Sequence, residues 1–383
     1  MALHFSAEEF SERRRRATAA MAEARLDGLL MFRQESMYYL TGYDTLGYVF
    51  FQCLYLGADG TLTLLTRAPD LLQAKHTSII EDVRIWVDAP DAKPAEQLRE
   101  ILASHGCKGK RLGVEWEAYG LTARNGRRLT AALEGFCTLA EASELVTRLR
   151  VVKSPPELAY VRRAAELCDA ALDAARGLAK PGASEADILA AMHGAVYRGG
   201  GDGPASEYII GSGPDALLCR YKSGRRNLDA DDQLTLEFAG AYRHYHSCLM
   251  RTLVIGRVDP RLTEMHKAAV EALQASEAAL KPGQTFGDVF DAHARVLDAL
   301  GHRGHRLNAC GYSLGSTFAP NWMDWPMHYH GNPVPLAPGM VVFLHMILFD
   351  AERGLAMTLG RTSEVTTAGA RVLSRASLDF RLD

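Results

Sequence analysis

A single carboxylate, Glu237, stands inside an apolar stretch and is the first residue whose place in the sequence suggests chemistry. The stretch DQLTLEFAGAYRHYHSCLMRT, residues 232–252, is typical of two β-strands joined by a Gly-containing bend. A carboxylate in a buried strand must be ion-paired, hydrogen-bonded, metal-bound or protonated, because burying a bare charge is costly. Glu237 is therefore the first candidate catalytic group, and a structural Glu paired with an Arg is the alternative.

Two further side chains extend this candidate site. Arg251 ends the second strand of the same hairpin. We expect it to keep Glu237 ionised and to contact the substrate, the alternative being a structural ion pair. His345 lies in an apolar strand, VVFLHMILF, where an unpaired imidazole is costly. We expect His345 to act as general acid and base on a leaving nitrogen, whereas a lone core His usually bonds only a backbone carbonyl.

An aromatic loop supplies candidates for substrate binding. The loop FAPNWMDWPMHYHGNP, residues 318–333, combines two Trp, a Tyr, two His and an Asp with three Pro. We expect Trp322 and Asp324 to form an aromatic wall with one negative charge, which suits a cation. Arg220, in the segment CRYKSGRRN, is permanently charged and forked, so it is suited to a carboxylate. Together they predict a small zwitterionic substrate, and aromatics that serve only the core or a dimer contact are the alternative.

The elements that position these residues fall into two parts. Up to about residue 140, β-rich runs alternate with amphipathic helices, the pattern of an α/β layer domain. The Pro-Pro pair at 155–156 breaks one element and begins a long helix. We therefore predict domains of residues 1–148 and 149–383. In the first domain we expect strands at 27–32, 48–57, 61–66, 83–87 and 111–115 and helices at 6–26, 94–106 and 122–133.

One design appears twice in the second domain. KPGASEADILAAMHGAVYRGG at 180–200 and KPGQTFGDVFDAHARVLDALG at 281–301 share Lys-Pro-Gly, a Ser or Thr cap, an Asp three residues later and an amphipathic helix. Two copies at this spacing indicate a duplicated domain rather than a solenoid. The sequence predicts two αβ halves related by a pseudo-twofold axis around a central site, with a chance likeness of two helix starts as the alternative.

The composition excludes several classes of protein. With 48% hydrophobic and 23% charged residues and a net charge of −3 over 383 residues, the chain has no basic excess for nucleic acid. The N-terminus lacks an apolar signal segment, and no later stretch is apolar enough to span a membrane, so we predict a cytoplasmic protein. Seven scattered cysteines without a CxxC pair argue against a disulfide framework or a zinc knuckle.

Five motifs follow one another along the chain: SMYYLTGYD (36–44), RLRVVKSPPELAYVRRA (148–164), EFAGAYRHYHSCLMRT (237–252), GYSLG (311–315) and APGMVVF (337–343). Together they resemble the creatinase/prolidase family, whose catalytic domain has the pita-bread α/β fold. The resemblance implies an N-terminal creatinase-like α/β domain followed by a pita-bread domain. It also implies a homodimer in which the first domain of one subunit closes the pocket of the other. The aromatic loop SMYYLTGYDTLGY of the first domain, which has no obvious role within that domain, fits this arrangement.

The metal site of that family does not transfer to this sequence. Its metal-dependent members bind two metals with two Asp, one His and two Glu, and these positions fall on Glu237, Cys248, Tyr312, His345 and Gly360. Because one carboxylate survives, we predict no dinuclear centre and no cofactor. A single Zn²⁺ on Glu237, Cys248 and His345 is the alternative.

Two family branches without metals, creatinase and ectoine hydrolase, cleave C–N bonds in small zwitterions. The hairpin resembles that of ectoine hydrolase, in which a Glu in an EIAG-like context is the covalent nucleophile. The resemblance therefore implies that Glu237 attacks an amidine or amide carbon and that water releases the covalent intermediate. Creatine is not the expected substrate, because the Glu of creatinase falls on Met250 and its catalytic His falls near Arg220.

The resemblance assigns three further roles and leaves two other functions open. His246 corresponds to a His that lines the family's pocket, so we expect it to contact the substrate. Tyr312 is expected to donate a hydrogen bond to a developing charge, or else to fill the space of the metals. Cys248 is expected at the pocket as well, with inert packing favoured over a thiolate. A metal-dependent Xaa-Pro peptidase and a non-catalytic binding protein on the same fold are the alternatives.

Overall fold

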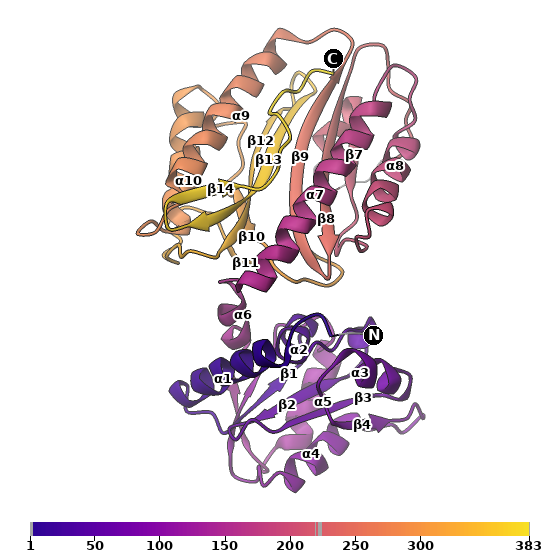
Figure 1. Ribbon diagram of the computed structural model, residues 1–383, viewed down its shortest axis with the longest axis vertical. Coiled ribbons are helices and arrows are strands. Elements are labelled where there is room, and N and C mark those ends of the chain that lie inside the picture. The colour runs from indigo at the N-terminus through magenta and orange to yellow at the C-terminus, as the bar shows by residue number, and fades with distance from the viewer. Residues whose placement is uncertain (1–2, 219, 221–223, 383) are drawn as a thin grey trace. The chain divides into compact units, whose positions relative to one another are not determined.

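The computed structural model forms two compact units, Met1–Arg150 and Val151–Asp383, and it describes residues 3–218, 220 and 224–382 (Figure 1). The sequence predicted a boundary between residues 148 and 149. Within the described ranges, no helix combines the length and the apolar content that crossing a membrane requires. Each unit has its own buried apolar core, and the α/β fold class is confirmed.

The first unit is a mixed sheet with helices on both faces. Its strand order is β4-β3-β2-β1-β5-β6. Leu29 and Met31 of β1 pack into a core with α1, whereas Leu30 between them packs into a core with α4 and α5, because alternate side chains of a strand point to opposite faces. The strands are β1 Gly28–Met31, β2 Cys53–Gly57, β3 Leu62–Arg67, β4 Asp82–Trp86, β5 Arg111–Val114 and β6 Thr138–Glu141, and the helices are α1 Ala7–Glu23, α2 Gln34–Thr41, α3 Leu71–Thr77, α4 Pro94–Ser104, α5 Ala123–Leu133 and α6 Leu145–Arg150.

One predicted strand of this unit is shorter than expected. The apolar run at 48–57 predicted a strand throughout, but β2 begins at Cys53 and a 3-10 helix, η1, occupies Gly47–Val49. The carboxylate of Asp70 explains the difference, since it accepts a hydrogen bond from Thr45 Oγ1, and Thr45 Oγ1 in turn accepts from the backbone N–H of Gly47. Polar contacts of this loop therefore override the β propensity of the run.

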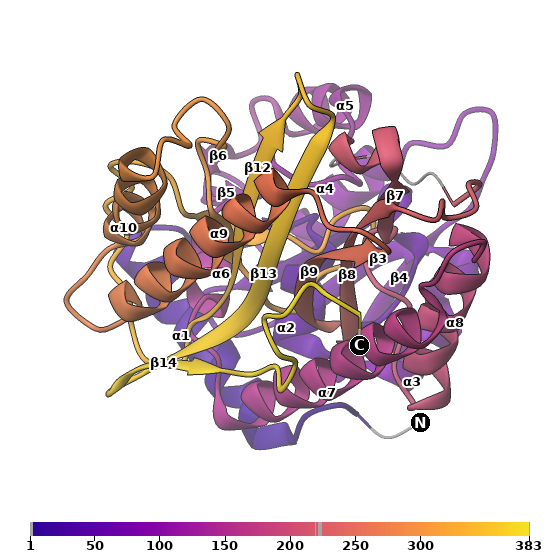
Figure 2. The ribbon, with the colours of Figure 1, turned by 90° about the horizontal axis from the view of Figure 1, so that it is seen from above.

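The second unit is built on a sheet of long antiparallel strands. Its order is β11-β10-β12-β13-β9-β8-β7, with β14 paired to β13. The helices α7 and α9 lie along one face of this sheet, α7 against β8 and β9 and α9 against β12 and β13 (Figures 1 and 2). The elements are α7 Pro155–Leu178, α8 Glu185–Arg198, β7 Ile209–Ser212, η3 Gly213–Leu217, β8 Asp232–Tyr242, β9 Tyr245–Ile255, α9 Pro260–Ala279, α10 Phe286–Ala299, β10 Gly311–Ser313, β11 Asp324–Met327, β12 Val341–Asp350, β13 Leu355–Thr366 and β14 Gly369–Val372.

The predicted duplication is confirmed in the second unit. One half runs α7-α8-β7-β8-β9 and the other runs α9-α10-β10-β11-β12-β13. Both Lys-Pro-Gly turns have the same geometry: Ala183 N donates to the Lys180 carbonyl at 3.0 Å, and Gln284 N donates to the Lys281 carbonyl at 3.2 Å. The glycine of each turn has a positive φ, +79° in the first and +88° in the second, a conformation that favours glycine.

The two faces of this sheet have different neighbours. Val342, Leu344, Met346 and Leu348 of β12 pack into the core that includes α9 and α10. Residues between them, such as His345, point to the other face. That other face carries the candidate site.

Candidate active site

The register of the second sheet brings Glu237 and His345 onto one face. Across neighbouring strands, His345 lies opposite Gly360, Gly360 opposite Met250, and Met250 opposite Glu237. Directly opposed residues of a sheet point to the same side. Glu237 and His345 therefore both project from the side away from the helices.

Tyr312 and Cys248 belong to the same face. Tyr312 lies opposite Phe343, two residues before His345, and Cys248 lies opposite Ala239, two residues after Glu237. A separation of two residues preserves the face of a strand. All five positions that the resemblance assigned to metal ligands thus share one side of the sheet.

The donor chemistry at these positions does not fit a two-metal centre. Gly360 offers no side chain, and Tyr312 holds its proton because burial raises the pKa of its phenol well above the ordinary value. Burial likewise raises the pKa of the Cys248 thiol well above its usual range. Among the described residues, no three His, Cys, Asp or Glu side chains are grouped to hold a metal ion.

A cavity of about 500 Å³ opens onto this face and contains five of the nine predicted site residues. These are Arg220, Glu237, Tyr312, Trp322 and His345. The volume lies in the range of small-molecule sites. The other lining residues are Ser206, Glu207, Tyr208, Ile209, Leu307, Ala309, Asn321, Met323, Met327 and Ile347.

A directed chain of hydrogen bonds ends on Glu237. Trp322 Nε1 donates to the phenol oxygen of Tyr312 at 2.8 Å, and Tyr312 donates to Glu237 Oε1 at 3.3 Å. The direction is fixed because an indole N–H can only donate, which leaves the phenol proton for the carboxylate. Tyr312 is thus a hydrogen-bond donor aimed at the candidate nucleophile.

Glu237 is poised between its two protonation states near neutral pH. Burial raises the pKa of its carboxyl to about 7, against the opposing effects of the Tyr312 hydrogen bond and the charge of Arg220. A group with a pKa near the working pH is suited to exchange protons or to attack as an anion.

His345 is a neutral imidazole at that pH. It is 8% exposed, and burial lowers its pKa to about 4, with a smaller contribution from the charge of Arg220. Its Nδ1 atom is buried without a hydrogen-bond partner among the described residues. A neutral ring has one N–H and one lone pair, so it can relay a proton but does not store one as an imidazolium.

Arg251 lies on the opposite face from Glu237, and the prediction that it keeps Glu237 ionised is wrong. It pairs with Leu236, one residue before Glu237, so its side chain points among the helices. Its guanidinium donates to three backbone carbonyls, those of Met250 at 2.8 Å, Gly360 at 2.7 Å and Ser377 at 3.3 Å. Arg220, which lines the cavity, is the cation whose charge acts on Glu237.

Three other predicted contacts do not line the cavity. Both ring nitrogens of His246 bond to protein, since Nε2 accepts from Ala205 N at 2.9 Å and Nδ1 lies 3.1 Å from Thr317 Oγ1. Cys248 is fully buried, and Asp324 Oδ1 accepts from the N–H of Trp325 at 2.9 Å. Their roles in substrate binding stay predictions.

Four of the ten lining residues that the sequence did not suggest come from one short segment. Ser206 to Ile209 line the cavity because β7 pairs with β8 and Ile209 lies opposite Glu237. A four-residue strand gives too weak a periodic signal to be recognised from sequence. Glu207 adds a second carboxylate to the cavity that no motif pointed to.

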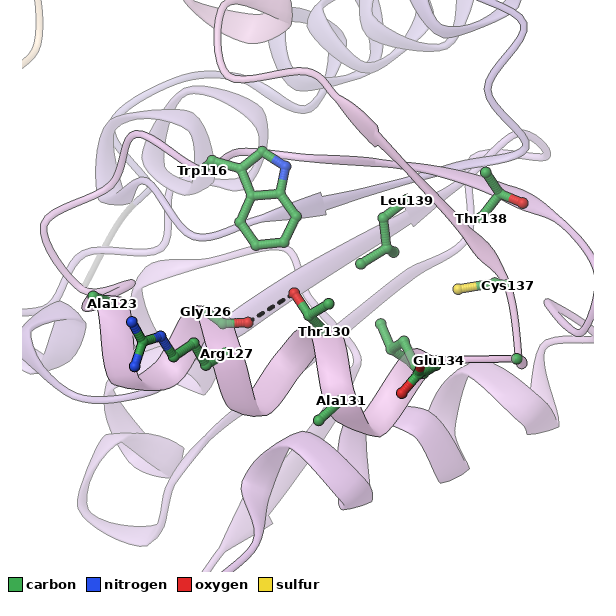
Figure 3. Close-up of a pocket in the computed structure, with 12 residues that line it drawn as sticks. Trp116, Ala123, Gly126, Arg127, Thr130, Ala131, Glu134, Cys137, Thr138 and Leu139 are labelled. Atoms are coloured by element: carbon green, nitrogen blue, oxygen red, sulfur yellow. Dashed lines mark hydrogen bonds between the residues drawn. The ribbon is translucent and has the colours of Figure 1, made fainter.

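The first unit has a larger hollow, but ionisable side chains do not come together in it. It measures about 800 Å³ and lies beside α5 and β6. Figure 3 shows Arg127 and Cys137 at opposite ends, with a hydrogen bond from Thr130 to the Gly126 carbonyl along the helix between them. Because its ionisable groups do not meet, it is not our candidate active site.

Comparison with known proteins gives full-length relatives. The chain is 28% identical to an uncharacterised hydrolase/peptidase of Sinorhizobium fredii, with 97% of each chain covered. It is 26% identical to the ectoine hydrolase of Halomonas elongata, with 98% of this chain and 97% of the relative covered. It is 22% identical to the Xaa-Pro dipeptidase of Pyrococcus furiosus, with 96% and 99% covered.

The fold agrees with solved structures, and the domains agree with two known families. The dipeptidase PepE of Mycobacterium ulcerans superposes with a TM-score of 0.86 at 24% identity, covering 99% of each chain. Residues 13–152 match the creatinase/prolidase N-terminal domain. Residues 159–367, more than half of the chain, match metallopeptidase family M24. The chain therefore belongs to metallopeptidase family M24 and has the creatinase/prolidase N-terminal domain in front of the catalytic domain.

Proposed function

We propose that this protein hydrolyses a C–N bond, of the amidine or amide type, in a small zwitterionic compound without a catalytic metal. The observation that carries the proposal is the state of Glu237. It is the single carboxylate left at the family's ligand positions, it faces the cavity, and it receives the Tyr312 hydrogen bond instead of a metal. A partly buried carboxylate whose pKa is raised to about 7 is a usable nucleophile in its ionised form.

The reaction proceeds in two steps on one carbon atom. A carboxylate oxygen of Glu237 bonds to the substrate carbon, and the C–N bond breaks with its electron pair on nitrogen, which takes up a proton. Water then adds to the same carbon, and the bond to Glu237 breaks to restore the carboxylate. The proton given to nitrogen comes from solvent in the first step, and one proton of the attacking water returns to solvent in the second step. His345, neutral before and after each step, relays both protons. The N–H and lone pair of His345 suit this transfer.

The charges of the cavity favour a zwitterion. Arg220 supplies a fixed positive charge that suits a substrate carboxylate. Glu207 and the indole of Trp322 supply the counterpart for a cationic group. The ectoine hydrolase of Halomonas elongata, similar over nearly its full length, supports the same class of substrate and reaction.

The test compares two substrate panels with and without a chelator. Purified protein is assayed on ectoine and other cyclic amidine carboxylates, and on Xaa-Pro dipeptides with added Mn²⁺, each with and without EDTA. The proposal expects hydrolysis of an amidine or amide zwitterion that EDTA does not change, with less than stoichiometric metal in the purified protein. Dipeptide cleavage that requires metal would instead favour the Xaa-Pro peptidase activity named for several relatives.

A further inference from the structure

A buried carboxylate outside the cavity, Glu185, holds two segments that are distant in sequence. Its side chain is fully buried at the start of α8. Oε1 accepts hydrogen bonds from Ser212 N at 2.8 Å and Ser212 Oγ at 2.6 Å. Oε2 accepts from the backbone N–H groups of Arg225 at 3.0 Å and Arg226 at 3.2 Å.

The chain between those two anchors includes Arg220. Ser212 ends β7, and Arg225 and Arg226 follow on the far side of Arg220. The anchors are also tied directly, because the Arg226 guanidinium donates to Ser212 Oγ at 2.6 Å. One carboxylate thus fixes both ends of the segment from which Arg220 reaches the cavity.

Capping of helix α8 does not explain the hydrogen bonds of the Glu185 side chain. The N-terminus of α8 is capped by the neighbouring Ser184, whose hydroxyl accepts from Ala186 N at 3.2 Å. The four donors named above instead belong to the ends of the Arg220 segment. An amide has one accepting oxygen, so its NH2 group would face one of the two pairs of donors, whereas the carboxylate accepts from both pairs.

We propose that Glu185 is a positioning residue that holds Arg220 at the cavity and so sets substrate affinity and the ionisation of Glu237. The inference rests on the proposed function for its substrate, but the position of the segment is tested without any substrate. The charge of Arg220 already acts on the Glu237 carboxyl in this structure. Loss of the hydrogen bonds to Glu185 would therefore change the pKa of Glu237 by moving Arg220, because Glu185 does not itself line the cavity.

The experiment compares full-length Glu185→Gln, Arg220→Ala and the double variant with the native chain. Hydrogen exchange of residues 213–226 reports the segment, and the pH midpoint for labelling Glu237 with a small carbodiimide, followed by peptide mass, reports its pKa. We expect at least about tenfold faster exchange in Glu185→Gln, because backbone donors lose their buried acceptor. We expect both single variants to raise the midpoint and the double variant to raise it no further.

Matched variants separate positioning from loss of stability. Asp169 is another buried carboxylate that accepts hydrogen bonds from a distant segment, at Ser374 Oγ and Arg375 N. Asp169→Asn should leave both the exchange rate of residues 213–226 and the labelling midpoint of Glu237 unchanged. If Glu185→Gln does not fold, Ser212→Ala removes one of the four donors and should give a smaller effect in the same direction. Unchanged exchange, or shifts that add in the double variant, would overturn the inference. These readouts decide it even if no C–N hydrolase activity is found.

Discussion

The Glu237 carboxyl faces a conflict between folding and chemistry. Burial favours the protonated acid, whereas attack on a carbon requires the anion. Tyr312 and Arg220 both lower the pKa of this carboxyl, but burial outweighs them. In the proposed metal-free mechanism, the phenol of Tyr312 and the guanidinium of Arg220 stabilise the anion.

This conflict predicts a rise of activity with pH. Because ionised Glu237 is the reactive form in the proposed mechanism, kcat/KM should increase as the pH passes about 7 and then level off. Tyr312→Phe removes a hydrogen bond that lowers this pKa, so the midpoint should move to higher pH. Tyr43→Phe, a buried tyrosine of the first unit, is the control and should leave the profile unchanged. A Tyr312→Phe profile that keeps its midpoint would contradict the assigned hydrogen bond.

Glu237→Gln should separate activity from stability. The variant should lose about a hundredfold or more in turnover, since a neutral amide is a poor nucleophile. The native carboxyl has a raised pKa, so it binds its proton more tightly than the unfolded chain does, and its ionisation destabilises the fold as pH rises from about 4.5 to about 7. The variant removes this effect, which is at most about 3 kcal/mol.

The measurement is thermal unfolding of both proteins at pH 5 and pH 8. The Gln variant should gain more stability at pH 8, and native protein mixed with substrate should carry added mass on the peptide containing Glu237. A Gln variant that melts earlier at both pH values and turns over normally would end the nucleophile hypothesis and indicate a structural Glu.

At the scale of elements, the site depends on how closely the β8–β9 hairpin approaches α7. Gly240 of β8 lies so close to α7 that an added Cβ would be 2.1 Å from the Ala164 carbonyl oxygen and 2.5 Å from Cys168 N. Any larger residue must push the strand away from the helix. The same strand carries Glu237, so this contact sets the position of the proposed nucleophile.

Gly240→Ala should destabilise the second unit by about 2 kcal/mol or more, because its obstacles are backbone atoms that cannot rotate away. Gly177→Ala is the matched control on α7, where an added Cβ has nothing within 4 Å. The control should be neutral or stabilising by up to about 1 kcal/mol. Urea unfolding of the full chain measures both. Equal stability of the two variants would show that strand and helix are not in close contact.

The elements also show what sequence could predict and what it could not. Helices such as α7 and the repeated Lys-Pro-Gly turns were predicted because their caps and periodicity are local signals. The side of the sheet on which Arg251 lies was mispredicted. It depends on the register between β8 and β9, and a shift of one residue in that register moves a side chain to the opposite side. The Trp322–Tyr312–Glu237 chain joins three segments, and no local pattern could supply their contact.

For the whole molecule, the duplicated halves account for the position of the site. Each half contributes one long hairpin to the sheet, β8–β9 and β12–β13, and the two meet where β9 pairs with β13. Glu237 comes from the first half, and Tyr312 and His345 come from the second. Duplication thus produced one site from two non-identical sets of side chains.

The first unit displays an apolar loop that has no evident purpose in a monomer. Leu46, Val49 and Phe50 are 75%, 59% and 45% exposed, although Thr45 and Asp70 fix the loop by a 2.6 Å hydrogen bond. Apolar side chains on an ordered loop are typical of a contact surface. The homodimer stays a prediction, and of these three residues only Leu46 belongs to the segment SMYYLTGYDTLGY on which it was based. The tyrosines Tyr38, Tyr39 and Tyr43 of that segment are fully buried in the first unit, so its expected lack of a role within the domain is wrong.

A double variant, Leu46→Asp with Val49→Asp, tests that prediction. Light scattering at micromolar concentration should find the native chain as a dimer and the double variant shifted toward monomer, because two carboxylates would be buried in the contact. Leu300→Asp, at a leucine that is 47% exposed in the second unit, is the control and should stay dimeric. If the loop completes the partner's pocket, specific activity should fall on dilution of the double variant together with the dimer fraction. A native monomer with full activity would refute the prediction, since each pocket would then work without a partner.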